Sequence, residues 1–196
     1  MIFICLWRVL LAIFPLDIVS ADDPLAGVTQ GYFDGKRPFD AVELVGERGH
    51  ILIPESGKIE SQWVFKAGVL TASPKWDSLV TPDHYQDFRM HVEFNVNSVV
   101  DVDPEKNGNS GIYIQKRYEL QILNSHGVSE GDYKASYAGS LYRQKKPDKL
   151  VSRPAGEWQS YDIVFRAARF KDGKRTENAR ISVQQNGVII HDDYAL

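Results

Sequence analysis

Cysteine is almost absent from this sequence: Cys5 is the only one among 196 residues. It lies in an apolar N-terminal stretch that we expect to be removed, so the mature chain should contain no cysteine. This excludes disulfide bonds, thiolate metal sites and a cysteine nucleophile. Cys5 also lacks the small preceding residues of a lipid-attachment site, so lipidation is not expected.

Common catalytic motifs are missing as well. The sequence has no GxSxG nucleophile elbow, no P-loop, no GxGxxG and no HExxH. Its histidines show no metal-ligand spacing among themselves, and we expect His91 and His191 to be structural. No cofactor is identified and no metal ligand set is predicted, although a divalent cation that polarises a substrate carbonyl stays open. The histidines are His50, His84, His91, His126 and His191.

A strong charge imbalance is also lacking, since the formal net charge is −3. Basic residues are scattered, and the pair Lys145–Lys146 is too short to follow a phosphate backbone. The sequence therefore predicts no nucleic-acid partner.

Residues 1–21 have the pattern of a signal peptide. Arg8 precedes an apolar stretch, and Val19 and Ala21 are the small residues expected before a cleavage point after Ala21. Pro15 and Asp17 interrupt the stretch short of the roughly 20 apolar residues of a spanning helix. We therefore expect a secreted or periplasmic protein without a membrane anchor after cleavage, and residues 22–196 suffice for one domain.

The hydrophobic pattern alternates with a period of two, which is typical of strands that place one face on a core. No long stretch has helical amphipathicity. Residues 181–185 and 188–191 flank Asn186-Gly187, whose residues tolerate the positive φ of a type I′ hairpin turn. The sequence predicts an all-β fold, a sandwich of two antiparallel sheets. Other predicted strands are 63–65, 68–70, 88–96 and 161–165.

The segment Asn109–Asn124, NSGIYIQKRYELQILN, predicts two strands, 111–115 and 117–123, with a polar face. On the second strand Glu119 and Gln121 face the same side, about 6 to 7 Å apart at the rise of a strand. A carboxylate, amides and aromatic rings on one face suit a sugar, whose hydroxyls need hydrogen bonds and whose C–H faces stack on rings. An exposed, solvated face is the alternative. The candidate binding residues are Asn109, Tyr113, Gln115, Gln121 and Asn124.

These residues resemble a known family, the 3-keto-disaccharide hydrolases, whose central motif is similar to GNSGIYIQKRYELQILNS at 108–125. The resemblance covers residues 28–193 and implies a concanavalin A-like jelly-roll sandwich. Further similar segments are Gly31–Lys36, Trp63–Leu70, Gly139–Tyr142 and Pro154–Ile163.

The sequence departs from the family pattern at three places. Asn124 stands where members commonly carry Asp, and Gln159 where they often carry Asn. Members usually continue to a final motif rich in Gly, His, Phe and Arg, whereas this sequence ends at Leu196. Because a missing closing strand would leave a sheet edge unpaired, we expect either a fragment or a sandwich that closes differently.

The strand that carries Glu119 also bears on mechanism. Retaining glucanases on this kind of sandwich present Glu-x-Asp-x-x-Glu along one strand, and here Gln121 and Asn124 replace the two later acids. A retaining mechanism needs a nucleophile and an acid/base about 5 Å apart. With a single carboxylate on the strand, that mechanism is disfavoured.

The resemblance implies hydrolysis of 3-keto-glycosides or 3-keto-disaccharides, a small-molecule sugar substrate. A ketone at C3 acidifies the C2 proton, so one base can start an elimination that is followed by rehydration. We expect Glu119 or His126 to be that base, with Gln121, Asn109 and Tyr113 donating hydrogen bonds to the enolate oxygen.

Two other functions remain open from the sequence. The same polar face would suit a non-catalytic carbohydrate-binding module, since a fold does not fix a function. The other function is a structural or adhesion sandwich, in which the polar side chains of these strands would not come together in a pocket.

Overall fold

The computed structural model describes residues 4–12, 41–57, 63–72, 77–97 and 106–196, the first range only in its backbone pairing. Within these ranges the chain forms strands, turns and loops without an α-helix. Accordingly, no helix there is long and apolar enough to cross a membrane. The motif Gly31–Lys36 and the expected cleavage point at Ala21 lie outside the described residues.

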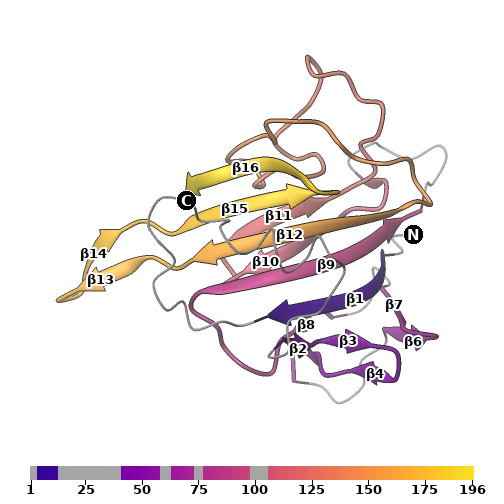
Figure 1. Cartoon of the computed structure of the whole chain (residues 1–196), viewed down its shortest axis with the longest axis horizontal. Coiled ribbons are helices and arrows are strands. Elements are labelled where there is room, and N and C mark those ends of the chain that lie inside the picture. Colours follow the sequence, from indigo (N-terminus) through magenta and orange to yellow (C-terminus); the bar gives the residue numbers. More distant parts are fainter. Residues whose placement is uncertain (1–3, 13–40, 58–62, 73–76, 98–105) are drawn as a thin grey trace.

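The largest sheet has eight strands (Figure 1), which run in the order β16-β15-β12-β9-β1-β7-β6 with β2 beside β1. Every pairing in it is antiparallel. The strands are β1 (Ile4–Ala12), β2 (Val42–Glu43), β6 (Val64–Lys66), β7 (Val69–Thr71), β9 (Phe88–Val96), β12 (Trp158–Arg166), β15 (Arg180–Gln185) and β16 (Val188–Ala195).

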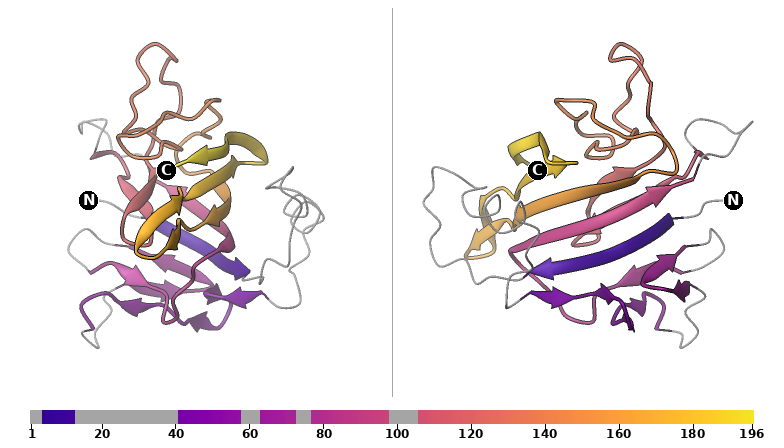
Figure 2. Two further views of the ribbon diagram at one scale, coloured as in Figure 1. Left: turned by 90° about the vertical axis from the view of Figure 1, so that its left-hand side faces the viewer. Right: turned by 45° about the vertical axis from the view of Figure 1, so that its right-hand side comes forward.

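Smaller antiparallel pairs surround this sheet. The hairpin of β10 (Ser110–Ile114) and β11 (Tyr118–Ile122) lies over one face as a second layer, and a long loop rises above it at the top of Figure 2. The hairpin of β13 (Arg169–Lys171) and β14 (Lys174–Glu177) projects from one end (Figure 1). The other pairs are β3 (Val45–Gly46) with β4 (Gly49–His50), and β5 (Ile53–Pro54) with β8 (Leu79–Val80).

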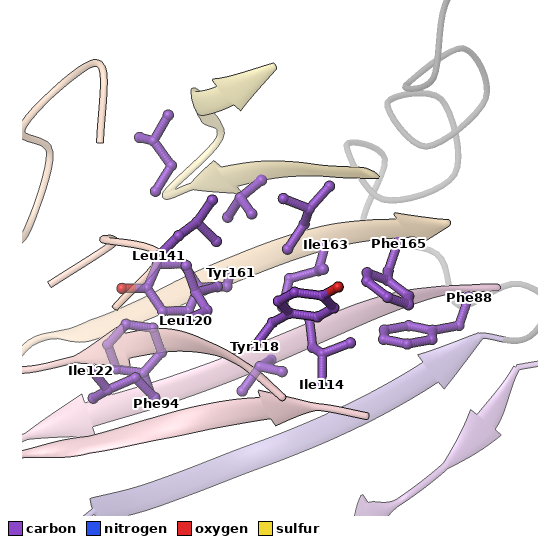
Figure 3. Close-up of a cluster of buried hydrophobic side chains, with 14 of the residues drawn as sticks. Phe88, Phe94, Ile114, Tyr118, Leu120, Ile122, Leu141, Tyr161, Ile163 and Phe165 are labelled. Carbon is purple, nitrogen blue, oxygen red and sulfur yellow. The ribbon is translucent and has the colours of Figure 1, made fainter. Parts of the chain in front are cut away.

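The hydrophobic core lies between the two layers (Figure 3). Two ring pairs join β9 to β12: Phe88 and Phe165 have centroids 5.3 Å apart, and Phe94 and Tyr161 4.7 Å apart. Tyr118 of β11 reaches the first pair, with its centroid 6.1 Å from that of Phe165. The fold is thus the predicted all-β, concanavalin A-like jelly-roll sandwich.

Most predicted strands are confirmed. Strands β9 and β12 contain residues 88–96 and 161–165, and Asn186 and Gly187 have φ of 52° and 81° in the turn between β15 and β16. The hairpin predicted at 63–65 and 68–70 is shifted by one residue, because Ala67 and Gly68 form its turn. The strand predicted to end at Gln115 ends at Ile114 instead.

The first strand falls within the predicted leader. Strand β1 lies between β9 and β7 and pairs antiparallel with both. The signal peptide stays a prediction; cleavage after Ala21 would remove β1 and leave the facing edges of β9 and β7 without that partner.

The face of the large sheet that points away from β10 and β11 carries a partly buried ion pair. His91 of β9 and Asp162 of β12 are cross-strand neighbours, and Nδ1 of His91 lies 2.6 Å from Oδ1 of Asp162. Glu93 Oε1 lies 3.9 Å from Nε2 of the same ring. Although burial alone would lower the pKa of His91, these carboxylates raise it to about 9. As expected, His91 occupies the polar face of its strand.

Candidate active site

The hairpin of β10 and β11 has one apolar and one polar face. Two of the residue pairs across it are Tyr113 with Glu119 and Gly111 with Gln121. Because side chains alternate along a strand, these four residues share the face that points away from the large sheet. The other face packs on the core through Ile114, Tyr118, Leu120 and Ile122, as the alternation predicted.

The carboxylate of Glu119 and the hydroxyl of Tyr113 form the centre of the polar face. Burial of the half-buried Glu119 raises the pKa of its carboxyl, and the hydrogen bond that Tyr113 donates to it works in the opposite direction. Burial and the same hydrogen bond raise the pKa of Tyr113 to about 12. At neutral pH the phenol therefore keeps its proton and holds the carboxylate in place.

Gln121 lies beside Glu119 but beneath the surface, because it is only 1% exposed. Its Nε2 donates to Oδ1 of Asn109 at 3.2 Å, while its Oε1 is buried without a hydrogen-bond partner. Gln121 and Tyr113 thus already have acceptors within the site: Asn109 accepts the hydrogen bond of Gln121, and Glu119 accepts that of Tyr113. Their role as donors to an enolate oxygen stays a prediction.

A third segment, Gly139–Tyr142, runs along the edge of β11 opposite β10 and adds a tyrosine to the site. Gln121 N donates to Ser140 O at 3.0 Å, and Tyr142 N donates to Glu119 O at 2.9 Å. Tyr142 therefore sits next to Glu119 on the polar face, near enough to Tyr113 to contribute to the raised pKa of that phenol. The guanidinium of Arg143 lies 5.1 Å from the centroid of the Tyr142 ring.

Three predicted site residues are not part of these hydrogen-bonded pairs. Gln115 is exposed in the turn between β10 and β11, with a φ of 52°, so it does not continue the row of Tyr113. Asn124 follows β11, and its backbone N–H donates to Asn107 O at 2.9 Å. His126 is exposed in the following loop, where its Nδ1 lies 2.8 Å from Ser152 O.

The His126 contact fixes the role of one ring nitrogen. A carbonyl oxygen only accepts, so Nδ1 carries a proton and donates it to Ser152 O. The structure thus pairs Tyr113 with Glu119 and Gln121 with Asn109 by hydrogen bonds, and His126 belongs to neither pair.

No group of three or more His, Cys, Asp or Glu side chains that could hold a metal ion occurs in the described ranges. A surface hollow lies elsewhere, at the hairpin of β3 and β4, where Glu43, Glu47, Arg48 and His50 are among its lining residues. None of the residues that line this hollow belongs to the candidate site of Asn109, Tyr113, Glu119, Gln121 and Tyr142. That site is therefore proposed from the chemistry of its side chains.

Comparison with known sequences identifies the chain. The pattern of the 3-keto-alpha-glucoside-1,2-lyase-like domain matches residues 49–196. The chain belongs to this family. Comparison with curated proteins gave no match.

Two solved structures from Parabacteroides distasonis ATCC 8503, each with a provisional name as a glycosyl hydrolase, are similar to this member of the 3-keto-alpha-glucoside-1,2-lyase-like family. One is 30% identical with a TM-score of 0.74, over 81% of this chain and 67% of that chain. The other is 18% identical with a TM-score of 0.47, over 77% of this chain and 65% of that chain. At a coarse level, the family and the first structure support a glycosyl hydrolase-like function.

Tyr142 is the site residue that the sequence did not single out. It belongs to the segment Gly139–Tyr142, which resembles a family block. Its place beside Glu119 depends on pairing between segments about 20 residues apart. Strand alternation does not reveal such a non-local contact. Its only signal in the sequence is that it belongs to this family-like block.

The position of Glu119 depends on the absence of a side chain at Gly111. A Cβ at Gly111 would clash with Oε1 of Glu119 and would lie 2.7 Å from Cγ of the same residue. We expect Gly111→Ala to displace the carboxylate and to lower catalytic turnover by about tenfold or more, since small misplacements of a reacting group are costly. Steady-state kinetics would measure this.

Gly131→Ala is the matched control, because nothing lies within 4 Å of a Cβ at that exposed position. Both variants should fold, as judged by circular dichroism and thermal unfolding. Equal activities of the two variants would contradict the role given to Gly111.

Proposed function

We propose that the protein cleaves 3-keto-glycosides and that Glu119 is the base that removes the C2 proton. The observation that carries this proposal is the half-buried carboxylate of Glu119 on the polar face of β11. Its pKa is raised, and Tyr113 of β10 donates a hydrogen bond to it. A base works best with a pKa shifted toward the working pH, which partial desolvation provides.

The proposed chemistry needs one base. Glu119 takes the C2 proton, the C2–H electron pair forms the C2=C3 bond of an enolate, and the ketone oxygen at C3 becomes the enolate oxygen. When the enolate collapses, the C3=O bond re-forms, the C2=C3 electron pair moves to make the C1=C2 bond, and the C1–O bond breaks; the leaving oxygen takes the proton that Glu119 had removed. Water then adds its hydroxyl at C1 and its proton at C2, so the sum is hydrolysis.

The composition of the strand argues for this route over double displacement. On β11 the residue next to Glu119 on the same face is Gln121, an amide that cannot act as a nucleophilic carboxylate or as an acid. A retaining glycosidase needs two carboxyl groups about 5 Å apart. Elimination needs a carboxylate only at C2, which suits Glu119.

Tyr113 can serve the proposed reaction in two ways, as a hydrogen-bond donor and as a ring on which the sugar stacks. With its raised pKa it remains protonated at neutral pH, so it can donate to an oxyanion after its hydrogen bond to Glu119 is exchanged. Its side chain is also 64% exposed, which allows a sugar ring to stack on it.

A sugar-release assay tests the function. The purified protein is incubated with a 3-keto-disaccharide and with its unoxidised parent, and released monosaccharide is followed by chromatography. We expect cleavage of the oxidised sugar alone. Cleavage of both sugars would indicate an ordinary glycosidase and would reject the proposal. Cleavage of neither sugar would also reject it.

The exposed Tyr113 ring also favours the second candidate, a non-catalytic carbohydrate-binding module. Calorimetry with the same two sugars would reveal binding without release. A structural or adhesion sandwich would neither bind nor cleave them.

We also propose that the protein is exported and that residues 1–21 are its signal peptide. The support is the leader pattern that ends at Ala21. Mass spectrometry of the protein from the culture medium or periplasm should give a chain that begins at Asp22, and an unprocessed N-terminus would contradict the leader.

A further inference from the structure

We propose that His191 is a positioning residue of the Glu119 site: its imidazole holds the Gly139 carbonyl, and so fixes the segment Gly139–Tyr142 against β11. This inference rests on the proposed function for its effect on catalysis, but its structural part can be tested without activity.

The contact links the two layers of the sandwich. His191 belongs to β16 of the large sheet and is completely buried, and its Nε2 lies 2.6 Å from Gly139 O. Because the carbonyl oxygen only accepts, Nε2 must carry the proton and donate it. Gly139 N in turn donates to Gln121 O at 3.0 Å. One glycine thus bridges β16 and β11.

The glycine cannot be replaced without disturbing this bridge. Gly139 has a φ of 75°, in the left-handed region that favours glycine. A Cβ there would lie 2.9 Å from Cδ1 of Ile190 and 3.0 Å from Oε1 of Gln185. The backbone is therefore packed directly against β15 and β16, and its carbonyl is buried, where an acceptor without a donor is costly.

The position of Gly139 is transmitted along the chain to the site. Ser140 O accepts from Gln121 N at 3.0 Å, and Tyr142 N donates to Glu119 O at 2.9 Å. These bonds tie the segment to the strand residues that carry the site. Tyr161 Oη donates to Gln121 O at 2.8 Å from the core side, so Gln121 is held from two directions. His191 touches none of the proposed reacting groups and acts through this backbone.

The state of the imidazole agrees with such a role. Burial lowers the pKa of His191 to about 4, and Lys145 contributes in the same direction, while the bond to Gly139 and the nearby Asp148 oppose it. The ring is neutral at neutral pH, and its Nδ1 is buried without a hydrogen-bond partner. The hydrogen bond to Gly139 O uses the donor at Nε2, and this donor is the property that a nonpolar residue of similar size would lack.

The first test is made on the wild-type protein. Long-range ¹⁵N NMR at pH 7 should show His191 as the neutral tautomer protonated at Nε2. A ring protonated at Nδ1, or at both nitrogens, would overturn the proposal, and this measurement does not depend on any variant folding.

The second test compares two variants. His191→Met removes the donor at similar volume, whereas His191→Gln keeps an N–H donor. In His191→Met we expect amide hydrogen exchange of Gly139 and Tyr142 to accelerate at least tenfold and kcat on a 3-keto-disaccharide to fall about tenfold, with a smaller change in KM. His191→Gln should retain most of the protection and most of the activity.

The outcomes separate the two proposals. Wild-type protein without activity on the 3-keto sugar rejects the proposed function, while the exchange data still decide the role of His191. A folded His191→Met variant with wild-type exchange at Tyr142 rejects positioning. If His191→Met does not fold, the comparison is made between His191→Gln and a core variant elsewhere in the large sheet, Ile163→Val on β12. Equal loss of protection at Gly139 and Tyr142 in these two variants would reject positioning.

Discussion

Glu119→Gln should abolish most of the cleavage of a 3-keto-glycoside while leaving the fold intact. Glutamine has the shape of glutamate and keeps an oxygen that can accept from Tyr113, but it cannot take a proton from C2. Removal of a general base typically costs about 10²–10⁴-fold in rate, and we expect a loss in kcat of this size. Steady-state kinetics with the oxidised disaccharide would measure it.

Glu157→Gln is the matched control for this substitution. Glu157 is exposed in the loop before β12, so its change should leave kcat and KM unaltered. His126→Gln distinguishes the two candidate bases, since His126 lies outside the hydrogen-bond network of Glu119. A large loss in His126→Gln together with wild-type turnover by Glu119→Gln would show that the base has been assigned to the wrong residue.

The pH dependence of kcat/KM adds a second readout of the same base. Activity requires the deprotonated carboxylate, so it should rise with pH through the raised pKa of Glu119. Tyr113→Phe removes the hydrogen bond that lowers this pKa, and we expect the rising limb to move to higher pH in that variant. An unchanged limb would mean that another group titrates there.

The ion pair of His91 and Asp162 should make the protein lose stability in mildly alkaline solution. The pKa of His91 is about 9 in the folded protein, above the value of 6.5 for a free side chain. The stabilisation is therefore fully present below about pH 6.5 and is lost as the pH rises through 9. A shift of this size corresponds to about 3 kcal/mol, an order-of-magnitude figure.

A double variant isolates this effect. His91→Gln with Asp162→Asn replaces both charged groups by amides, so neither partner is left as a buried, unpaired charge. Urea unfolding between pH 6 and pH 10 should show a decline in the free energy of unfolding of the wild type that exceeds that of the double variant by about 3 kcal/mol. Parallel curves would mean that His91 is not charged in the folded protein.

Local patterns in the sequence predicted most of the fold. Alternation identifies β9 and β12 because each has one face on the core, and Asn186-Gly187 marks a hairpin because its conformation is intrinsic to those residues. The end of β10 was missed for the opposite reason. Gln115 and Lys116 adopt φ of 52° and 54° although neither is glycine, so nothing in the local sequence marks the turn.

The candidate site was predicted only in part, because its remaining features depend on contacts between distant segments. The row of Glu119, Gln121 and Tyr113 follows from strand alternation. The burial of Gln121 does not, because the segment around Gly139 and Ser140 covers the edge of β11. The link from His191 to that segment spans 52 residues and has no local signature.

The amide at Gln121 also has a consequence for inhibitor design. Retaining glycosidases pass through a covalent ester between the sugar and a nucleophilic carboxylate, and inhibitors can act by making that ester long-lived. With Gln121 beside Glu119 on β11, the proposed reaction forms no glycosyl ester, so sugars that act by trapping one should not inactivate the protein. Planar sugar analogues that carry an acidic enol would instead imitate the intermediate and should be the effective ligands.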